Sequence, residues 1–219
     1  MSITKDYLPK HPNIPIYQDD EMFRINTDTE VLGEFINIYQ SDVVLDMGTN
    51  NGALLLYASL FKPKQLLGLE INEKALILAK RNLEENNITN YKLINDNIIT
   101  YTGEEVDVII CNPPYFKTKV EDHGSNSFKA LAKHESELTL DKLIKAIKRN
   151  LRNGGTLFLL FLTSRLDEVL ETLRENALNV KRMKFVFDIN KAYSNVFMVE
   201  AVKGGNRGMV VEKPVIIKR

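Results

Sequence analysis

The residues with the clearest chemical potential are Asn112, Pro113, Pro114 and Tyr115, which directly follow an apolar run at 106–111. An amine attached to a planar ring or a carbonyl is a weak nucleophile, because its lone pair is delocalised. Chemistry at such an amine needs fixed hydrogen-bond acceptors, which the Asn112 side chain and the Pro113 carbonyl supply. The two prolines stiffen the turn, and the Tyr115 ring can stack on a planar base. These four residues therefore predict a catalytic clamp for a planar amine or amide.

A second polar group of residues occupies the turn DMGTNNG (46–52), after the apolar segment 41–47. This turn lacks the G-x-G-x-x-G spacing that admits the phosphates of a dinucleotide. A carboxylate at its start would repel phosphate and would suit a cation. S-adenosylmethionine carries an ammonium and a sulfonium and has no phosphate. We therefore expect this cofactor to contact Asp46, Gly48, Thr49 and Asn51.

Polar residues also follow the next strand-like segments. Glu70 comes 22 residues after the first glycine of the turn, where an acid can accept the hydroxyl groups of a ribose, and Ile71 follows it. Asp96 and Asn97 lie at the end of the third segment and are expected to meet an adenine edge, while Asn112 borders the cofactor at the end of the fourth. Each residue alone could be an ordinary turn or capping residue. Their joint placement at successive strand ends favours a cofactor site.

Strand-like and helix-like segments alternate along most of the chain. The expected strands are 41–47, 65–71, 91–96, 106–111, 156–162, 180–187 and 195–202, and the expected helices are 52–60, 72–86, 139–155 and 164–176. This alternation predicts a parallel sheet with helices on both faces, and the two closing strands predict an antiparallel hairpin. Asn72 is expected to cap its helix, and Thr27 with Glu30 has the spacing of a capping box. Gly154–Gly155 is expected to end the third helix.

We predict a single domain over residues 1–219. Three stretches lie outside the alternation: a lid or extension at 1–27, a polar substrate loop at 116–137 and a basic tail at 203–219. Residues 18–27 are expected to cross the cofactor as a lid.

These motifs together resemble those of the class I S-adenosylmethionine-dependent methyltransferases, whose first motif commonly reads D-x-G-x-G-x-G. Asp46, Gly48 and Gly52 match it, whereas Asn50 stands where the middle glycine is usual. Asparagine tolerates left-handed backbone, so we expect the turn to keep its shape. The resemblance implies an α/β, Rossmann-like fold with a mostly parallel seven-stranded sheet and an antiparallel C-terminal hairpin. The N-P-P-Y motif resembles that of methyltransferases acting on adenine N6, guanine N2 or the glutamine amide.

Longer stretches resemble a narrower family, the bacterial tRNA1(Val) (adenine-37 N6) methyltransferases. They are the segments 18–36, 111–116, 130–144 and 193–208. This resemblance implies methylation of an adenine beside the anticodon of a tRNA. Three alternatives stay open: methylation of a protein glutamine, methylation of guanine N2 in rRNA, and a non-catalytic RNA-binding module. Glutamine methyltransferases normally carry an N-terminal helical domain, which residues 1–27 cannot supply.

Charge is unevenly distributed although the net charge is zero. Residues 1–112 carry 9 Lys and Arg against 17 Asp and Glu, whereas residues 113–219 carry 20 against 12. Such asymmetry favours a polyanionic partner, here tRNA. The basic face of the helix at 139–152 is expected to be an ordinary solvated face, and His134 fits a capping role as well as an RNA contact. The expected RNA contacts are Phe116, Lys117, Lys119, Lys133, His134, Lys203, Arg207, Lys218 and Arg219.

Bulk features exclude several classes of protein. The one cysteine, Cys111, allows no disulfide within the chain and fits a reducing compartment. The N-terminus lacks the apolar core of a signal peptide, and the longest apolar run, 157–162, is too short to span a bilayer. No cysteine–histidine cluster suggests a metal. We therefore expect a cytoplasmic protein without a membrane or metal partner, with a monomer favoured.

Overall fold

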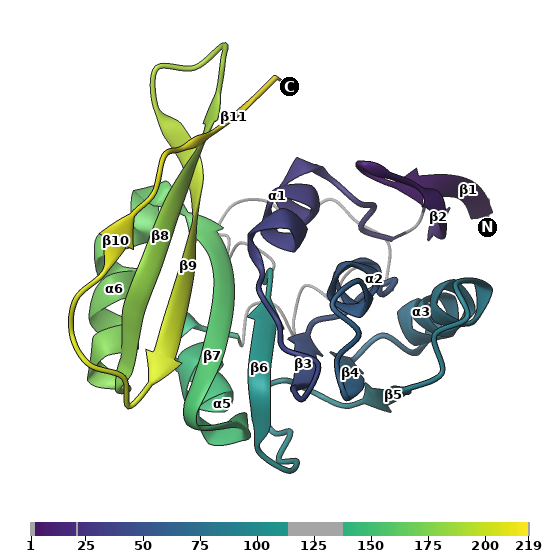
Figure 1. Ribbon diagram of the computed structural model, residues 1–219, viewed down its shortest axis with the longest axis horizontal. Coiled ribbons are helices and arrows are strands. Elements are labelled where there is room, and N and C mark those ends of the chain that lie inside the picture. Colours follow the sequence, from purple (N-terminus) through teal and green to yellow (C-terminus); the bar gives the residue numbers. More distant parts are fainter. Residues whose placement is uncertain (1–2, 21, 114–137, 219) are drawn as a thin grey trace.

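The computed structural model describes residues 3–20, 22–113 and 138–218 (Figure 1). Its centre is a nine-stranded sheet in the order β10-β8-β9-β7-β6-β3-β4-β5, with β11 also paired with β8. The strands are β3 (Val43–Met47), β4 (Gln65–Glu70), β5 (Tyr91–Asn95), β6 (Val106–Cys111), β7 (Leu151–Leu162), β8 (Leu178–Asp188), β9 (Ser194–Lys203), β10 (Val210–Val211) and β11 (Val215–Ile217).

Strands β3 to β7 are parallel, whereas β9 is antiparallel to both β7 and β8. The predicted seven-stranded, mostly parallel sheet with a closing hairpin is therefore confirmed for β3 to β9. The basic tail adds two short strands that run parallel to β8.

Helices cover both faces of the sheet, as predicted. Val44 and Leu45 of β3 point into two separate hydrophobic clusters, because successive residues of a strand face opposite sides. Leu32 belongs to the first cluster and Ile144 to the second. The first face carries α1 (Thr27–Phe35), α2 (Ala53–Ser59) and α3 (Glu73–Glu85), and the second carries α5 (Leu140–Asn150) and α6 (Leu166–Glu175) (Figure 1).

The strand order reverses between β3 and β6. The chain passes from β3 outward to β4 and β5, and then returns to the other side of β3 to form β6. Met47 at the end of β3 therefore lies beside Cys111 at the end of β6. Ligands of open α/β sheets bind outside the carboxyl ends of the strands at such a reversal, so this edge is where a site is expected.

The N-terminal stretch forms a hairpin that the sequence did not predict. It consists of β1 (Ile3–Leu8) and β2 (His11–Asp19), which make a separate antiparallel sheet. Leu8 and Ile16 bury their side chains in the first hydrophobic cluster. The prolines of β2 concealed the strand, because proline is tolerated in strands mainly where no ladder hydrogen bond is needed.

Two expectations about helix starts have different outcomes. Asn72 caps α3 as predicted, and its side-chain oxygen accepts a hydrogen bond from the Lys74 amide at 3.1 Å. The capping box of Thr27 and Glu30 is wrong. Asn26 is the N-cap of α1, because its Oδ1 accepts the hydrogen bond from the helix backbone at 3.0 Å.

The end of α5 also differs from the prediction. The helix ends at Asn150, before Gly154–Gly155, and β7 begins at once with Leu151. Leu151 is paired with Val106 across an irregular register, so strand pairing overrides the helical pattern of this segment. In the part of the chain that the structure describes, no helix is both long and apolar enough to cross a membrane.

Candidate cofactor and substrate site

The turn after β3 has the backbone shape that its glycines suggest. The φ angles of Gly48, Asn50 and Gly52 are 85°, 47° and 81°, so the left-handed conformation predicted for Asn50 is confirmed. The Gly48 amide donates a hydrogen bond to the Leu69 carbonyl of β4 at 2.9 Å. A Cβ on Gly52 would lie 3.3 Å from the Cβ of Ala79 on α3. Glycine at position 52 therefore allows both the turn and the close approach of α3.

Polar atoms of this turn are buried without partners. The exposed fractions of Asp46, Thr49 and Asn51 are 1%, 3% and 3%. Both carboxylate oxygens of Asp46, the Thr49 hydroxyl and the Asn51 Nδ2 have no hydrogen-bond partner in the described structure. Within the described ranges, every buried side-chain nitrogen or oxygen without a partner belongs to this turn. Since each such group costs about 1–3 kcal/mol, the turn is built to receive a polar ligand.

The Asp46 carboxyl determines the charge of that ligand. Burial, and to a lesser degree the charge of Glu70, raise the pKa of Asp46 to about 7. The Thr49 hydroxyl lies close by without a well-aligned hydrogen bond, so it offsets only part of this rise. A cation beside the carboxyl would favour its charged form, whereas a phosphate would be repelled. The turn therefore fits a ligand with positive charge.

Glu70 lies at the end of β4, where the sequence placed it. Its Oε2 accepts a hydrogen bond from the Asn50 amide at 3.0 Å, and its Oε1 accepts one from the Asn72 amide at 2.9 Å. The carboxylate thus ties the glycine-containing turn to the start of α3. Each oxygen keeps a further lone pair, and Glu70 is only half-buried, so both can also accept from a ligand. Ile71, 37% exposed, follows directly.

The end of β5 is shaped by local hydrogen bonds. Asp96 is exposed, and its Oδ1 accepts from the Asn97 amide at 2.7 Å. Asn97 in turn accepts from the Ile99 amide at 2.9 Å. This turn brings Ile98 to the site, where its Cδ1 lies 3.8 Å from the position that a Cβ on Gly48 would take. Sequence reasoning missed Ile98, because an isolated apolar residue in a turn carries no chemical signal.

Asn112 and Pro113 lie beside the turn after β3, because Cys111 and Met47 are in register. Asn112 is half-buried and Pro113 is buried. The Cys111 thiol donates a hydrogen bond to the Met47 carbonyl at 3.5 Å, and burial raises its pKa well above the usual value. Cys111 is therefore a structural thiol and not a nucleophile. The structure brings the predicted residues after β3, β4, β5 and β6 to one edge.

The remaining predicted residues of the clamp and the substrate loop lie outside the described residues and stay predictions. They are Pro114, Tyr115, Phe116, Lys117, Lys119, Lys133 and His134, together with Arg219 of the tail.

The N-terminal segment contacts the site through residues that sequence reasoning did not select. Asn82 of α3 is fully buried; its Oδ1 accepts from the Tyr17 amide at 2.7 Å, and its Nδ2 donates to the carbonyls of Tyr17 and Asn51 at 3.0 and 2.8 Å. The Asn50 side chain donates to the Phe23 carbonyl at 2.6 Å. The glycine-containing turn is thus attached to β2 through Asn82, and directly to the segment that follows β2.

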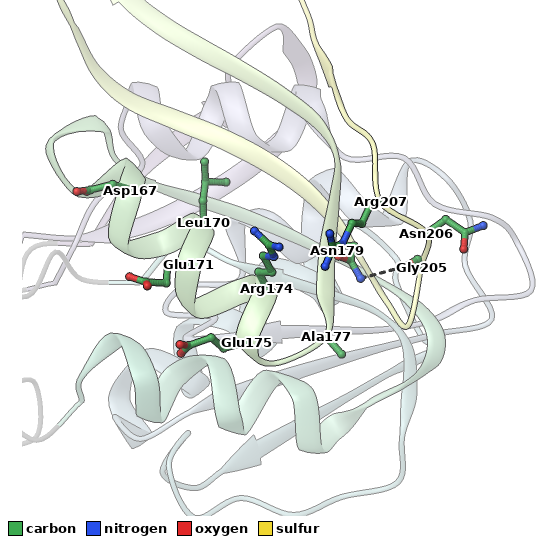
Figure 2. Close-up of a pocket in the computed structure, with 10 residues that line it drawn as sticks. All are labelled: Asp167, Leu170, Glu171, Arg174, Glu175, Ala177, Asn179, Gly205, Asn206 and Arg207. Carbon is green, nitrogen blue, oxygen red and sulfur yellow. Dashed lines mark hydrogen bonds between the residues drawn. The ribbon is translucent and has the colours of Figure 1, made fainter.

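Among the basic residues predicted to bind RNA, the three that the structure describes do not gather in one place. The Lys203 ammonium donates to the carbonyls of Lys148 and Leu151 at 2.9 and 2.6 Å, at the end of α5. Arg207 lines a broad hollow of about 990 Å³ between α6, the start of β8 and the segment after β9 (Figure 2). Because β9 is antiparallel to β7, both residues lie at the sheet edge opposite the candidate site. Lys218 follows β11, which pairs with the end of β8 on the same edge as the site.

The comparisons with known proteins agree with this geometry. A family model described as "Methyltransferase small domain" matches residues 16–186. The chain belongs to this methyltransferase family. A curated "tRNA1(Val) (adenine(37)-N6)-methyltransferase" of Cytophaga hutchinsonii is 31% identical to it over 88 residues, which span 40% of this chain and 36% of that relative. One of Pseudoalteromonas translucida with the same description is 29% identical over 101 residues, spanning 46% and 43%. The matched stretches thus cover less than half of these relatives.

Solved structures share the fold of this methyltransferase-family chain. A methyltransferase from Pyrococcus furiosus superposes with a TM-score of 0.65 at 22% identity, covering 88% of this chain and 90% of the other. Methanocaldococcus jannaschii Trm5 in complex with adenosine superposes with a TM-score of 0.66 at 14% identity, covering 93% and 56%. The predicted Rossmann-like methyltransferase fold is confirmed. Within the described residues, no group of three or more His, Cys, Asp or Glu side chains could hold a metal ion.

Proposed function

We propose that the protein transfers a methyl group from S-adenosylmethionine to the N6 amine of an adenine in tRNA, with adenine 37 of tRNA1(Val) as the target. The proposal depends mainly on one observation. A turn with unsatisfied buried polar atoms, suited to a cation, lies beside Asn112–Pro113 at the reversal of the sheet. The names of the curated relatives support the choice of adenine in tRNA as acceptor.

The turn after β3 and the neighbouring strand ends would hold the cofactor. S-adenosylmethionine supplies a methyl group activated by a sulfonium and presents an ammonium but no phosphate. Asp46 would balance its positive charge, and the free lone pairs of Glu70 would accept its ribose hydroxyls. Thr49 and Asn51 would supply further polar contacts, and Asp96 and Asn97 would meet the adenine edge. Ile71 and Ile98 would offer apolar surface to the adenine ring.

Asn112 and Pro113 would prepare the acceptor. The side-chain oxygen of Asn112 and the carbonyl of Pro113 accept hydrogen bonds from the two protons of the amine. This turns the lone pair of the nitrogen out of conjugation with the ring. The buried position of Pro113 holds its carbonyl in place, and fixed geometry of this kind lowers the barrier by removing the need to orient the reactants. The product sheds its extra proton to water, so no histidine base is required.

The substrate must present an unpaired adenine. A base that is stacked within a duplex cannot reach a clamp at the sheet edge, so the target is extruded or lies in a loop. Tyr115 is proposed to stack on that base. A tRNA substrate also agrees with the cytoplasmic location that we proposed from the single cysteine.

Residues 1–27 are proposed to complete the cofactor site. The contacts of Asn82 with Tyr17 and of Asn50 with Phe23 support this role, because together they fix β2 and the segment after it near the turn. Deletion of residues 1–24 is then expected to abolish cofactor binding, which equilibrium dialysis with labelled S-adenosylmethionine can measure.

The proposal is tested by supplying labelled S-adenosylmethionine with unmodified total tRNA, and with release-factor protein and DNA as parallel acceptors. We expect label in tRNA alone, recovered as N6-methyladenosine on nucleoside analysis and mapped to position 37 by sequencing. Label on a protein glutamine would overturn the choice of acceptor while retaining the clamp. Cofactor binding without label on any acceptor would favour a binding module.

A further inference from the structure

A second hollow, of about 510 Å³, opens on the same edge of the sheet as Asn112. It lies where β7 ends and β9 begins, and the 3-10 helix Thr163–Arg165 and the first turn of α1 complete it. Its size falls in the range of small-molecule sites. The residues that matter for its chemistry are Asp28, Ser164, Tyr193 and Asn195.

The hollow lies close to the amine clamp. β7 is the single strand between β6 and β9, so these two strands are separated by about 10 Å. Leu159 of β7 lies beside Cys111, and β7 continues three residues further to Leu162, which pairs with Val196 at the hollow. The hollow therefore lies within reach of a nucleotide next to a base held at Asn112.

The side chains at the hollow suit a base and its ribose. Tyr193 is 66% exposed and forms no hydrogen bond or ring contact with the described part of the chain, so its ring is available for stacking. The Ser164 hydroxyl and the Asn195 amide can each donate and accept hydrogen bonds. Asp28 is 5% exposed, and its acidic side chain disfavours a phosphate inside the hollow. Phosphates should therefore stay at the rim.

Two exposed lysines lie in the connection that leads to Tyr193 and in the tail that packs against this connection. Lys191 is exposed and lies two residues before Tyr193 in the connection between β8 and β9. Lys218 follows β11, and the Ile189 amide donates to the Ile217 carbonyl at 2.8 Å, which holds this connection against the tail. Neither lysine has an ion-pair partner among the residues described. Their charges are therefore available to a polyanion.

We propose that this hollow is a second nucleotide subsite, in which Tyr193 stacks on a base next to the target adenine while Lys191 and Lys218 contact the backbone phosphates. The subsite rests on the proposed function, since it assumes an RNA substrate. It would make Tyr193 a residue that determines which flanking nucleotides are accepted.

The test measures binding of a fluorescent 12-nucleotide single-stranded RNA containing the target adenine, by anisotropy, alongside cofactor affinity. We expect Tyr193→Ala to weaken RNA binding about tenfold, and Tyr193→Phe to keep it, because stacking needs the ring and not the hydroxyl. Tyr39→Ala is the matched control. Tyr39 is 71% exposed but precedes β3, at the opposite edge of the sheet. Cofactor affinity should be unchanged in all three variants.

A modified RNA identifies the base that stacks. Removing the base on one side of the target adenine, as an abasic nucleotide, should weaken binding to the native protein by the same factor. Tyr193→Ala should then lose nothing further with that RNA. Lys191→Gln should lower the slope of log Kd against log salt concentration by about 1, and the control Lys62→Gln should leave it unchanged.

The outcomes separate the subsite from the proposed function. If Tyr193→Ala binds RNA as tightly as the native protein, the subsite is wrong even when tRNA is methylated. If the native protein binds no RNA and methylates a protein glutamine, the proposed function is wrong, and the subsite, which assumes an RNA substrate, is wrong with it. A loss of activity toward a peptide in Tyr193→Ala would then show that the hollow holds a protein segment, which also overturns the subsite.

Discussion

The two edges of the central sheet differ in how their polar groups are satisfied. The edge at the amino ends of the parallel strands carries the larger hollow, of about 990 Å³, where the Asn179 side chain donates to the Gly205 carbonyl at 2.9 Å (Figure 2). The edge at the carboxyl ends carries a smaller hollow and the turn whose buried polar atoms have no partner in the described ranges. Volume therefore does not distinguish the edge of the candidate site. Buried polar side-chain atoms without a partner among the described residues do.

Basic residues at the two edges show the same contrast. At the amino edge, Lys203 is 18% exposed and is held by two backbone carbonyls. At the carboxyl edge, Lys191 and Lys218 have no ion-pair partner among the residues described. A lysine that already satisfies helix-end carbonyls adds to stability, whereas an unpaired one can attract a polyanion. The following changes test whether function is confined to the carboxyl edge.

The largest effect is expected at Asp46. Its pKa is raised from 3.8 to about 7. Between these two pH values, the folded protein therefore retains a proton on this carboxyl that the unfolded chain has released. The stability associated with the protonated carboxyl is complete below about pH 4 and is lost as the pH rises to 7. The loss is about 4 kcal/mol. Asp46→Asn should remove this pH dependence and be the more stable protein at pH 8, as urea unfolding at pH 5 and pH 8 can show.

The Asp46→Asn substitution should affect cofactor binding in the direction opposite to its effect on stability. The Asp46→Asn variant should bind S-adenosylmethionine more weakly, because the neutral amide cannot balance a cation. Native affinity should rise as the pH increases through about 7, and the variant should show no such rise. If the variant bound the cofactor as tightly as the native protein at pH 8, the Asp46 carboxylate would not be part of the cofactor site.

Asn112→Ala should produce the next largest change. Loss of one acceptor of the clamp should lower the rate of methyl transfer about 100-fold while cofactor affinity stays within a few-fold. Asn179→Ala, which removes the same side chain at the amino edge, should leave the rate unchanged. Equal losses in the two variants would contradict the assignment of the chemistry to one edge.

Asn82→Ala tests the connection between the N-terminal hairpin and the turn. It should lower the free energy of unfolding by about 2 kcal/mol, because the backbone groups of Tyr17 and Asn51 lose their buried partner. Cofactor affinity should fall by about fivefold. The control is Asn86→Ala at the C-cap of α3, whose side chain donates to the Pro15 carbonyl of the hairpin but does not contact the turn. It should leave cofactor affinity unchanged; an equal fall in both variants would make the effect one of general stability.

The smallest effects are expected at the amino edge. Lys203→Met should lower stability by about 1 kcal/mol through loss of its carbonyl contacts. Neither this variant nor Arg207→Gln should alter RNA affinity or its salt dependence. A fall of about 1 in the salt slope for either one would show that RNA extends to this edge.

The polar residues after β3, β4, β5 and β6 could be predicted because a parallel sheet brings all its carboxyl ends to one edge. The sequence alone did not show that Lys203 and Arg207 lie at a different edge of the sheet from Lys218. That distinction requires the direction of β9 and the pairing of the tail. The roles of Asn82 and Phe23 depend on contacts between distant segments, which leave no local pattern. The start of α1 was misplaced by one residue because Asn26 and Thr27 are both good caps.

The hydrogen bonds between Asn82 and Tyr17 also set an order of events during synthesis. The two residues are 65 positions apart, so β1 and β2 leave the ribosome well before the helix to which they attach. At about 5–20 residues per second, the hairpin waits roughly 3–13 s for its partner. A two-stranded hairpin is only marginally stable alone, so this segment gains its final structure after α3 has formed. The hairpin therefore leaves the ribosome before α3 but takes its final place beside the glycine-containing turn only after α3 has formed.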